Sequence, residues 1–479
     1  MSKIRPILYG FFHPYCNAGG GGERVLWQAV EDTLKFDEEC KVIIYSGDTD
    51  SSVSKILANV VKRFNIKLDE KRLIFNFLKK RHLVDPRTWP SLTLLGQAFG
   101  SMILSYEAIK SFEFKPDVWI DTMGYPFSYP IVYLFLQIPI IAYVHFPVIS
   151  KDMLNKLNFS LSIYGVKQLL KYIYWYSFLI AYKLVGRLVD ITLTNSSWTN
   201  NHIKSIWTLN RDITILYPPC STENFVNPEE FNNKEKWTRD NSIVVLAQFR
   251  PEKRHLLIIE QYSIFLSQLA EISVAPKLIL IGSIRNDNDK DYVNELKEKS
   301  RKLKIPSSHI EFQLDLPFNE VLKFLRTSSY GLNAMWNEHF GIAVVEYVAN
   351  GLIPIVHASA GPYLDIVVPW DSKLQKQVES TEASRTGFFF KDKSDPDYKL
   401  GFDELNEVFK KIINLSDEEK MEMSKRGQNC VLEKFSNKKF DNEWNRSLSK
   451  IPELYYYNKT TLFIWIIVAI ISFTFTQIL

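Results

Sequence analysis

Cysteine is scarce in this sequence of 479 residues, and its four copies lie far apart, at Cys16, Cys40, Cys220 and Cys430. No CxxC pair or nearby histidine spacing would hold zinc, and the simpler interpretation is a reducing compartment. Long runs of lysine and arginine are also absent and the formal net charge is only +4, so nucleic acid is not indicated as a partner. We expect no secretory signal peptide, because the apolar run at 7–12 is too short and lacks a cleavage site.

Apolar residues make up 46% of the chain and charged residues 23%, as in globular proteins, and the length exceeds what one core usually serves. Short apolar, β-branched runs alternate with longer helical patterns, which predicts an α/β fold of βαβ units around parallel sheets. The expected strands lie at 7–12, 41–45, 73–77, 118–121, 140–144 and 190–194 in the first half, and at 242–247, 278–282, 310–314, 331–334, 353–356 and 387–390 in the second.

The segment Pro218-Pro219-Cys220, with the polar stretch 232–241 after it, marks the expected domain boundary. We predict two Rossmann-like, doubly wound domains, at 1–217 and 218–450, with room for the last helices to pack back on the first domain. Ligands of such sheets bind outside the carboxyl ends of the strands, so a cleft is expected there, between the two domains.

Residues 460–479 carry no charge and are long enough as a helix to cross ~30 Å of hydrocarbon, which predicts a C-terminal membrane anchor. Basic residues lie on its N-terminal side, which places the bulk of the protein in the cytosol. A buried C-terminal helix is the alternative, disfavoured by the lack of a polar face. The uncharged stretch 91–106 and the aromatic and basic stretch 163–189 are further candidates for lipid contact, with buried helices as the alternative.

Four glycines, Gly19, Gly20, Gly21 and Gly22, separate the first expected strand from a helical pattern. Without Cβ atoms, this turn can bring backbone N–H groups close to a phosphate or sugar at a helix N-terminus. A plain flexible turn is the alternative, but so short a connection rarely needs four glycines.

Cationic and imidazole side chains follow two other expected strands. Arg250 and Lys253 come after the first strand of the second domain, where they suit a departing diphosphate; an exposed basic helix start is the alternative. His145 directly follows the expected strand at 140–144, so it is a candidate for ligand contact as well as for a buried core histidine.

The segment Glu338-His339-Phe340-Gly341-Ile342 and, further on, Glu346 form the most informative pattern. Gly341 permits close backbone approach, so the N–H groups of 340–342 can face a phosphate while Glu338 lies near the sugar. Glu346 falls about one helical turn later, where a ribose diol can donate to its carboxylate. An internal salt bridge is the alternative, and it would explain one glutamate but not both.

No metal site is predicted. The acidic run 287–291 resembles a calcium loop, but Tyr292 occupies the position at which that loop needs glycine.

These residues resemble the GT-B glycosyltransferases of family 4. The resemblance extends to the α-1,2-mannosyltransferases of asparagine-linked glycan assembly through the segments HPYCNAGGGGERVLW, YVHFPVIS, TNSSWT, YPPCST, AQFRPEKRH, LIGSIRNDND and NEHFGIAVVEYVANGLIPIVHASAGP. It implies transfer of two mannoses, with retention and without a metal or other cofactor. The implied donor is GDP-mannose and the implied acceptor is dolichol-diphosphate-linked Man3GlcNAc2. The implied location is the cytosolic face of the endoplasmic reticulum membrane, with other mannosyltransferases of the pathway as candidate partners.

By position, the resemblance assigns diphosphate to the glycine loop and to Arg250 with Lys253. It assigns mannose to Glu338, ribose to Glu346 and the sugar to His145. The family often has arginine where this chain has Gln248, and Arg250 is expected to replace it. Two alternatives stay open: a transferase of the same fold that uses another sugar nucleotide, and a non-catalytic scaffold subunit of a membrane transferase complex.

Overall fold

The computed structural model describes residues 5–110, 114–150, 153–154, 163–210, 212–225, 237–398 and 401–454. The anchor expected at 460–479 lies outside these residues. The chain divides into two compact units. Unit 1 takes its residues from Met1–Asn195, Thr199–Pro218 and Phe440–Leu479, and unit 2 from Ser196–Trp198 and Pro219–Lys439.

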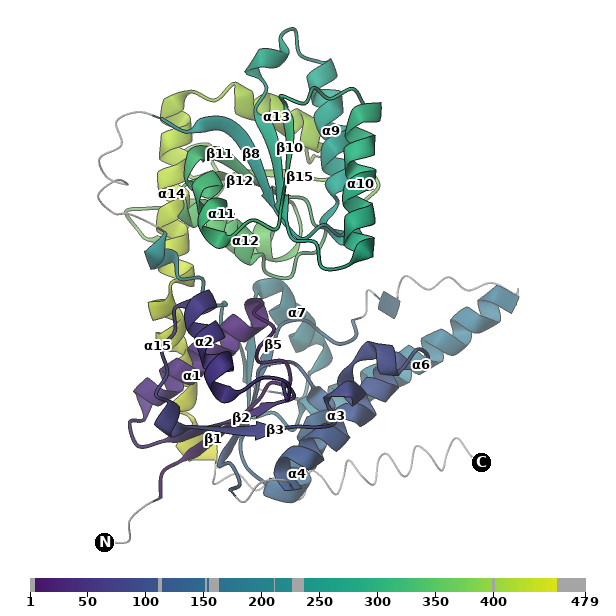
Figure 1. The fold of residues 1–479 in the computed structure, drawn as a ribbon, viewed down its shortest axis with the longest axis vertical. Helices are drawn as coiled ribbons and strands as arrows, with labels where there is room; N and C mark the ends of the chain where they lie inside the picture. The colour runs from purple at the N-terminus through teal and green to yellow at the C-terminus, as the bar shows by residue number, and fades with distance from the viewer. Residues whose placement is uncertain are drawn as a thin grey trace. The chain divides into compact units, whose positions relative to one another are not determined.

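Unit 1 is built on a parallel sheet of seven strands in the order β3-β2-β1-β4-β5-β6-β7 (Figure 1). The strands are β1 (Leu8–Phe12), β2 (Lys41–Ser46), β3 (Leu73–Phe77), β4 (Val118–Asp121), β5 (Ile140–Val144), β6 (Ile191–Thr194) and β7 (Ile213–Ile215). They are short and rich in β-branched and aromatic residues. The five inner strands are buried along nearly their whole length, as in parallel sheets covered by helices, whereas the edge strands β3 and β7 are only partly buried.

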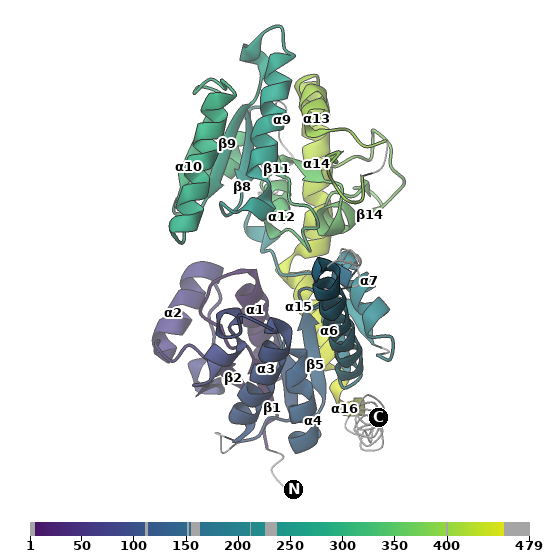
Figure 2. The same ribbon diagram turned by 90° about the vertical axis from the view of Figure 1, so that its right-hand side faces the viewer.

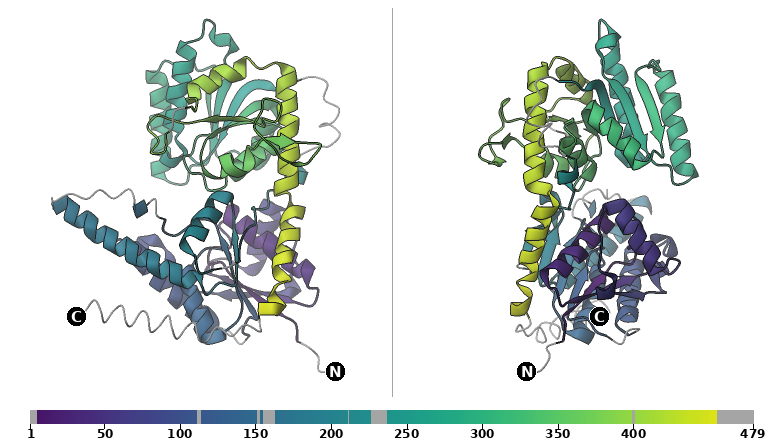
Figure 3. Two further views of the ribbon diagram at one scale, coloured as in Figure 1. Left: turned by 180° about the vertical axis from the view of Figure 1, so that it is seen from behind. Right: turned by 60° about the vertical axis from the view of Figure 1, so that its left-hand side comes forward.

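Helices cover both faces of this sheet, and alternate strand residues point into one of two cores. One core joins the sheet to α1 (Gly21–Phe36), α2 (Val53–Phe64), α15 (Asn437–Leu448) and α16 (Ile451–Leu454). In this core the indole of Trp444 donates to the Thr33 hydroxyl at 3.0 Å, and Figure 3 shows α15 in yellow beside the sheet. The other core joins the sheet to α3 (Thr93–Lys110), α4 (Tyr129–Leu136), α6 (Ile163–Gly186) and α7 (Ser197–Ile206).

Unit 2 repeats the plan with six parallel strands in the order β10-β9-β8-β11-β12-β15. They are β8 (Asp240–Leu246), β9 (Lys277–Gly282), β10 (Ile310–Leu314), β11 (Ser328–Asn333), β12 (Ile353–His357) and β15 (Phe388–Phe390), and the short strands β13 (Trp370–Asp371) and β14 (Lys376–Gln377) form a separate hairpin. On one face the core contains α9 (His255–Ser267), α10 (Asp287–Lys302) and α13 (Leu405–Ile413); Figure 2 shows α9 and α10 side by side. On the other face α11 (Phe318–Thr327) and α12 (Ile342–Ala349) cover the sheet, and α14 (Asp417–Phe435) packs against α12.

The predicted α/β class with two parallel sheets is confirmed. In each sheet the chain first winds outward from one central strand and then returns to wind outward on its other side. The reversal lies between β1 and β4 in unit 1 and between β8 and β11 in unit 2. Ligands of open parallel sheets bind outside the carboxyl ends of the strands at such switch points. The fold therefore directs attention to the loops after these four strands.

The two stretches expected to touch lipid are helical in the structure, as α3 and α6. Within the described part of the chain, no helix combines the length and the apolar character needed to cross a bilayer. Of α6, side chains are described from Lys167 onward.

Candidate active site

The loop after β1 holds a buried acid and imidazole at the start of α1. His13 is fully buried, its Nε2 donates to Glu23 Oε1 at 3.4 Å, and its Nδ1 lies 2.8 Å from the Thr122 hydroxyl. Glu23 also accepts the N–H of Gly20, the residue that precedes α1. Burial alone would raise the pKa of Glu23, but the His13 hydrogen bond and charge and the Gly20 N–H hold it below its ordinary value. The Glu23 carboxylate therefore helps to cap the N-terminus of α1, where the helix dipole also favours negative charge.

The glycine loop needs its small residues at two positions in particular. Gly19 has φ +79°, and a Cβ there would collide with the Arg63 side chain, which donates to the Ala18 carbonyl at 2.9 Å. Gly22 lies inside the first turn of α1, and a Cβ there would lie 3.7 Å from His145 Nε2. The structure thus brings two predicted site residues, Gly22 and His145, close together.

The loop after β4 is fixed by the carboxylate of Asp121. This buried side chain accepts the N–H groups of Met123, Gly124 and Tyr125 at 2.9, 2.9 and 2.7 Å, and the hydroxyl of Tyr129 at 2.8 Å. Burial raises the pKa of Asp121 even against these four donors. The carboxylate holds the loop in one conformation beside the end of β5.

His145 follows β5 directly and faces that loop. Its Nε2 donates to the Thr122 carbonyl at 3.0 Å, and the ring packs on Tyr143 with the centroids 5.0 Å apart. The first contact fixes the proton on Nε2, so the ring is oriented before any ligand arrives.

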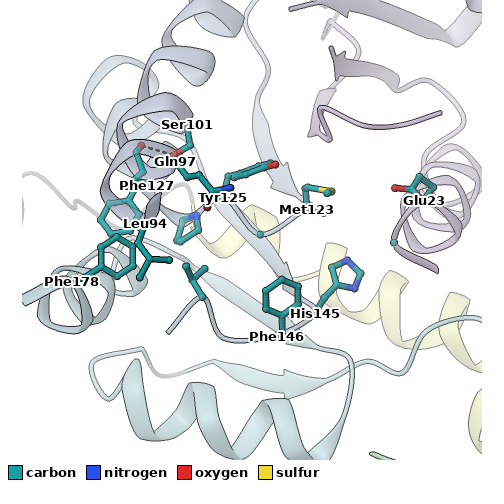
Figure 4. Close-up of a pocket in the computed structure, with 15 residues that line it drawn as sticks. Glu23, Leu94, Gln97, Ser101, Met123, Tyr125, Phe127, His145, Phe146 and Phe178 are labelled. Atoms are coloured by element: carbon teal, nitrogen blue, oxygen red, sulfur yellow. Dashed lines mark hydrogen bonds between the residues drawn. The ribbon is translucent and has the colours of Figure 1, made fainter. Parts of the chain in front are cut away.

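These loops open into a pocket of about 450 Å³, within the range of ~300–1,000 Å³ typical of small-molecule sites. Figure 4 shows Glu23 and His145 at one end of the pocket, Phe127 and Phe178 with Gln97 and Ser101 at the other, and Tyr125 between them. The lining comes from the start of α1, from the loops after β4 and β5 and from α3 and α6: Gly22, Glu23, Leu94, Gln97, Ala98, Ser101, Met123, Gly124, Tyr125, Pro126, Phe127, His145, Phe146, Val148 and Phe178. Such a pocket suits a ligand with both hydroxyl groups and apolar faces, as in a sugar.

At the switch point of unit 2, the loops after β8 and β11 meet in an ion pair. Lys253 ends the short helix η6 (Pro251–Lys253), and its Nζ donates to Glu338 Oε2 at 2.6 Å. The two side chains are 24% and 17% exposed, so the pair is reachable but partly desolvated. The expected alternative of an exposed basic helix start does not describe Lys253. Arg250, half-buried just before η6, makes no side-chain hydrogen bond or ion pair with any other described residue.

The start of α12 has the geometry of an anion site. Gly341 precedes the helix with φ +99°, a conformation that other residues rarely adopt, and a Cβ there would lie 3.1 Å from Pro362 Cγ. The first N–H groups of a helix have no partner within it, so those of Ile342 and the next residue point outward along the axis. The Phe340 side chain instead packs in the core on Phe435, and Glu346 lies half-buried about one turn into α12.

A buried network connects these loops and was not foreseen from the sequence. His357, at the end of β12, contacts Asp395 through Nε2 at 2.7 Å and the Ser359 hydroxyl through Nδ1 at 2.8 Å. Ser359 accepts the N–H of Asn337 at 2.8 Å, and Asp395 pairs with Arg254 at 2.9 Å. Burial alone would raise the pKa of Asp395, but its hydrogen bond to His357 keeps it lowered. Because Asn337 precedes Glu338 and Arg254 follows Lys253, the network holds both sides of the ion pair.

Each unit therefore brings its own predicted residues together: Gly22 with His145, and Lys253 with Glu338. Sequence reasoning missed the partners that orient them, namely His13, Glu23, Thr122, Asp121, His357 and Asp395. The sequence could have singled out His13 and His357, because each is a polar residue at the end of a buried strand, as His145 is. Among the described residues, no group of three or more histidine, cysteine or acidic side chains is arranged to hold a metal ion.

Comparison with known proteins gives matches along most of the chain. Residues 6–207 match the family model described as ALG11 mannosyltransferase N-terminus, and residues 226–429 match that of glycosyl transferases group 1. Solved structures similar to this chain include a glycosyltransferase from Rickettsia africae, with a TM-score of 0.58 and 14% identity over 95% of this chain and 100% of that one. A UDP-forming alpha,alpha-trehalose-phosphate synthase from Burkholderia xenovorans reaches a TM-score of 0.62 at 10% identity, over 93% and 99% of the two chains. At such low sequence identity, these structural similarities establish the fold alone, which is a GT-B-like α/β fold.

Curated relatives are far more similar in sequence. The GDP-Man:Man(3)GlcNAc(2)-PP-Dol alpha-1,2-mannosyltransferase of Candida glabrata is 50% identical over 462 residues, which are 94% of this chain and 90% of the relative. The proteins of that name from Kluyveromyces lactis and Xenopus laevis are 50% and 43% identical, over 93% and 76% of this chain and 78% and 76% of theirs.

Proposed function

The chain belongs to the family of GDP-Man:Man(3)GlcNAc(2)-PP-Dol alpha-1,2-mannosyltransferases, and on that premise we propose that it transfers mannose from GDP-mannose to dolichol-diphosphate-linked Man3GlcNAc2. The products carry α-1,2 linkages, and two mannoses are added in succession to give Man5GlcNAc2. The observation that carries the proposal is the Lys253–Glu338 pair at the switch point of unit 2. A scaffold subunit has no need of a partly buried cation and carboxylate at this position beside an open helix N-terminus.

Unit 2 supplies the groups proposed to hold the donor. Arg250 and Lys253 bind the diphosphate with the N–H groups at the start of α12, since a guanidinium fork, an ammonium and a helix N-terminus all favour phosphate oxygens. Glu338 accepts hydroxyl protons of the mannose, and Glu346 those of the ribose. The Lys253–Glu338 bond keeps both side chains oriented before the donor binds.

Unit 1 supplies the groups proposed to act at the sugar and the acceptor. The N-terminus of α1, with Gly22, serves the diphosphate, and His145 contacts the mannose. The pocket beside them takes the acceptor's carbohydrate, for which the faces of Tyr125 and Phe146 and the amide of Gln97 offer apolar and polar contacts.

The transfer proposed here proceeds with retention at the mannose C1. The bond from C1 to the β-phosphate oxygen breaks, and its electron pair stays with GDP while the positive charge spreads over C1 and the ring oxygen. The acceptor hydroxyl oxygen then bonds to C1 on the same face, and its proton passes to the departing phosphate oxygen. Arg250 and Lys253 stabilise the charge that develops on that phosphate. As the family resemblance implies, the scheme includes no metal ion or other cofactor.

The lipid-linked acceptor also bears on location. We place the protein on the endoplasmic reticulum membrane with both units in the cytosol and residues 460–479 as the anchor, because basic residues precede that uncharged segment. Other mannosyltransferases of the same pathway are the proposed protein partners.

A direct assay tests the function. The purified chain is incubated with radiolabelled GDP-mannose and Man3GlcNAc2 on a diphosphate lipid, and the mannoses added to each acceptor are counted. We expect two, released only by an α-1,2-mannosidase. Glu338→Ala should abolish the transfer, whereas Glu311→Ala, which removes the ion pair with Lys277 on β9, should leave it intact. Incorporation from UDP-N-acetylglucosamine instead, or an active Glu338→Ala protein, would refute the donor or the role of Glu338.

A further inference from the structure

Large apolar side chains are exposed on one face of α6. Leu169, Ile173, Tyr176 and Ile180 follow each other at spacings of four, three and four residues, which places them in one stripe along the helix. Their neighbour Leu170 is 63% exposed. Soluble proteins rarely leave such a continuous row open to water, so the stripe calls for an occupant.

Basic side chains continue the same stripe beyond its apolar residues. Lys183 and Arg187 follow Ile180 at spacings of three and four residues, and both are exposed. Lys167 and Lys171 are exposed near the other end, and α6 contains no acidic residue at all. Aromatic rings accompany the charges, as where Lys171 Nζ lies 4.4 Å from the centre of the Trp175 ring.

A second stripe runs along the neighbouring helix α3. Leu95, Phe99 and Tyr106 are exposed on one face of it, and the row ends at the exposed Lys110. The two helices adjoin, because the Tyr174 hydroxyl accepts the N–H of Leu95 at 3.1 Å, and Figures 1 and 2 show them side by side. The one acid of α3, Glu107, is already engaged by the N–H groups of Lys79 and Lys80.

Unit 2 offers a contrast within the same chain. Its exposed large apolar residues are scattered over helices and loops without a common face, at Ile264, Ile272, Val274, Phe318, Tyr363, Leu364 and Leu374. Isolated residues of this kind are ordinary on protein surfaces. The described residues of unit 2 therefore form no stripe like those of α3 and α6.

We propose that the exposed stripes of α3 and α6, here called the α3–α6 face, bind the surface of a lipid bilayer that contains anionic lipids. Apolar stripes with aromatic rings and lysines, and without acidic side chains, match the layer between acyl chains and anionic headgroups. A second copy of the chain fits poorly, since pairing two such faces would bring lysines and arginines together without a counter-charge. The inference deepens the proposed function, because Leu94 and Phe178 of these helices also line the pocket assigned to the acceptor glycan. The face would present that pocket to an acceptor that is itself embedded in the bilayer.

The first test reads out position rather than overall binding, because residues 460–479 are expected to hold the full chain on vesicles by themselves. All four native cysteines are buried, so a single introduced cysteine can be labelled selectively. An environment-sensitive dye is attached to Ile173→Cys and, as the matched control in unit 2, to Val274→Cys, whose parent residues are 52% and 47% exposed. Phosphatidylcholine vesicles with and without phosphatidylserine are then added.

We expect the dye at 173 to brighten several-fold and to be quenched by nitroxide-labelled lipid, more strongly with phosphatidylserine and less at high salt, while the dye at 274 does not change. Equal responses at both positions, or none at 173, would overturn the proposal. A change at 173 that grows with protein concentration in the absence of vesicles would also overturn it, in favour of a second copy as the occupant.

The second test separates this inference from the proposed function. Ile173→Glu is compared with Val274→Glu, and both should fold because the parent side chains are exposed. Transfer is measured to an acceptor in vesicles and to the same glycan on a short, water-soluble diphosphate lipid. We expect Ile173→Glu to lose transfer several-fold with the vesicle acceptor only. Equal rates for the two variants in vesicles would refute the membrane role, whereas a wild-type protein inactive on both acceptors would refute the proposed function instead.

Discussion

The pair Lys253–Glu338 allows a double substitution to decide between a structural and a catalytic role. If it were only an internal salt bridge, removing both charges together would cost little, because no unpaired charge would remain. If each group also contacts the substrate, the double variant must be at least as inactive as the worse single variant. Lys253→Met, Glu338→Gln and their combination therefore form a complete double-mutant cycle.

The expected magnitudes follow from the exposure of the two side chains. At 24% and 17% exposed, the pair lies between surface pairs, typically worth about 0.2–1 kcal/mol, and buried pairs, whose disruption costs about 3–5 kcal/mol. A coupling of about 1–2 kcal/mol in the free energy of unfolding is expected. Such a loss leaves the protein folded, since domains are usually stable by about 5–15 kcal/mol.

The effect on catalysis should be larger than the effect on stability. Removing one preorganised group that stabilises developing charge typically lowers kcat by about 100- to 1,000-fold. We expect this from Lys253→Met and from Glu338→Gln, with no recovery in the double variant. The same set of variants is measured in two ways. Urea unfolding gives the coupling in the free energy of unfolding, and mannose transfer under saturating GDP-mannose gives the effect on kcat. A double variant that regains wild-type transfer would show that the pair acts only through structure and would refute the roles assigned here.

Two further predictions concern unit 1. Gly22→Ala should fold at least as stably as the wild type, because alanine is favoured over glycine inside a helix by up to about 1 kcal/mol and the new Cβ makes an ordinary contact, 3.7 Å from His145 Nε2. Mannose transfer should nevertheless fall, since the methyl group enters the pocket. A variant with unchanged kcat and KM would show that Gly22 is not part of the site. Asp32→Asn should stabilise the protein at about pH 8 and have little effect at about pH 4. Burial raises the pKa of Asp32 to about 7 against the lowering effect of its Gln28 hydrogen bond, so the folded state keeps a proton that the unfolded state releases above its ordinary value of 3.8, and the free energy of unfolding falls as pH rises between these values. A tenfold change in an acid dissociation constant corresponds to ~1.4 kcal/mol, so we expect Asp32→Asn to raise the free energy of unfolding by a few kcal/mol at the higher pH. Melting curves in which the variant and the wild type differ equally at both pH values would contradict this.

The strands were predictable because their signal is local. Those expected at 73–77, 118–121, 140–144 and 310–314 have these same bounds in the structure, and the other eight differ by one to three residues at an end. The strand β7 escaped prediction because it has only three residues, at the edge of the sheet and close to the prolines of the domain boundary. The strand β11 begins earlier than expected, at Ser328, where the buried Ser329 hydroxyl finds a partner: it donates to the Asp240 carbonyl at 2.8 Å.

The orienting partners of the site could not be predicted, because they depend on contacts between residues far apart in the chain. His13 contacts Thr122 across 109 positions, and Lys253 contacts Glu338 across 85. A single sequence carries no mark of such pairs. It does carry the polar residue at the end of a buried strand, the signal that singled out His145 and that applies equally to His13 and His357.

Strand order explains why the histidines that carry this local signal lie near the loops at the switch points. A polar residue after a buried strand can become part of a site if its strand lies at the point where the winding reverses or one strand beyond it. The ends of β1, β4, β8 and β11 and the loops after them meet this condition, and they contain the glycine turn, Asp121, Lys253 and Glu338. His145 and His357 follow β5 and end β12, each one strand further from the reversal, and each is tied by hydrogen bonds to a loop at the reversal itself. A histidine at the end of a buried strand, at the reversal or one strand beyond it, is therefore better interpreted as a group that orients or contacts the ligand than as one buried for packing alone.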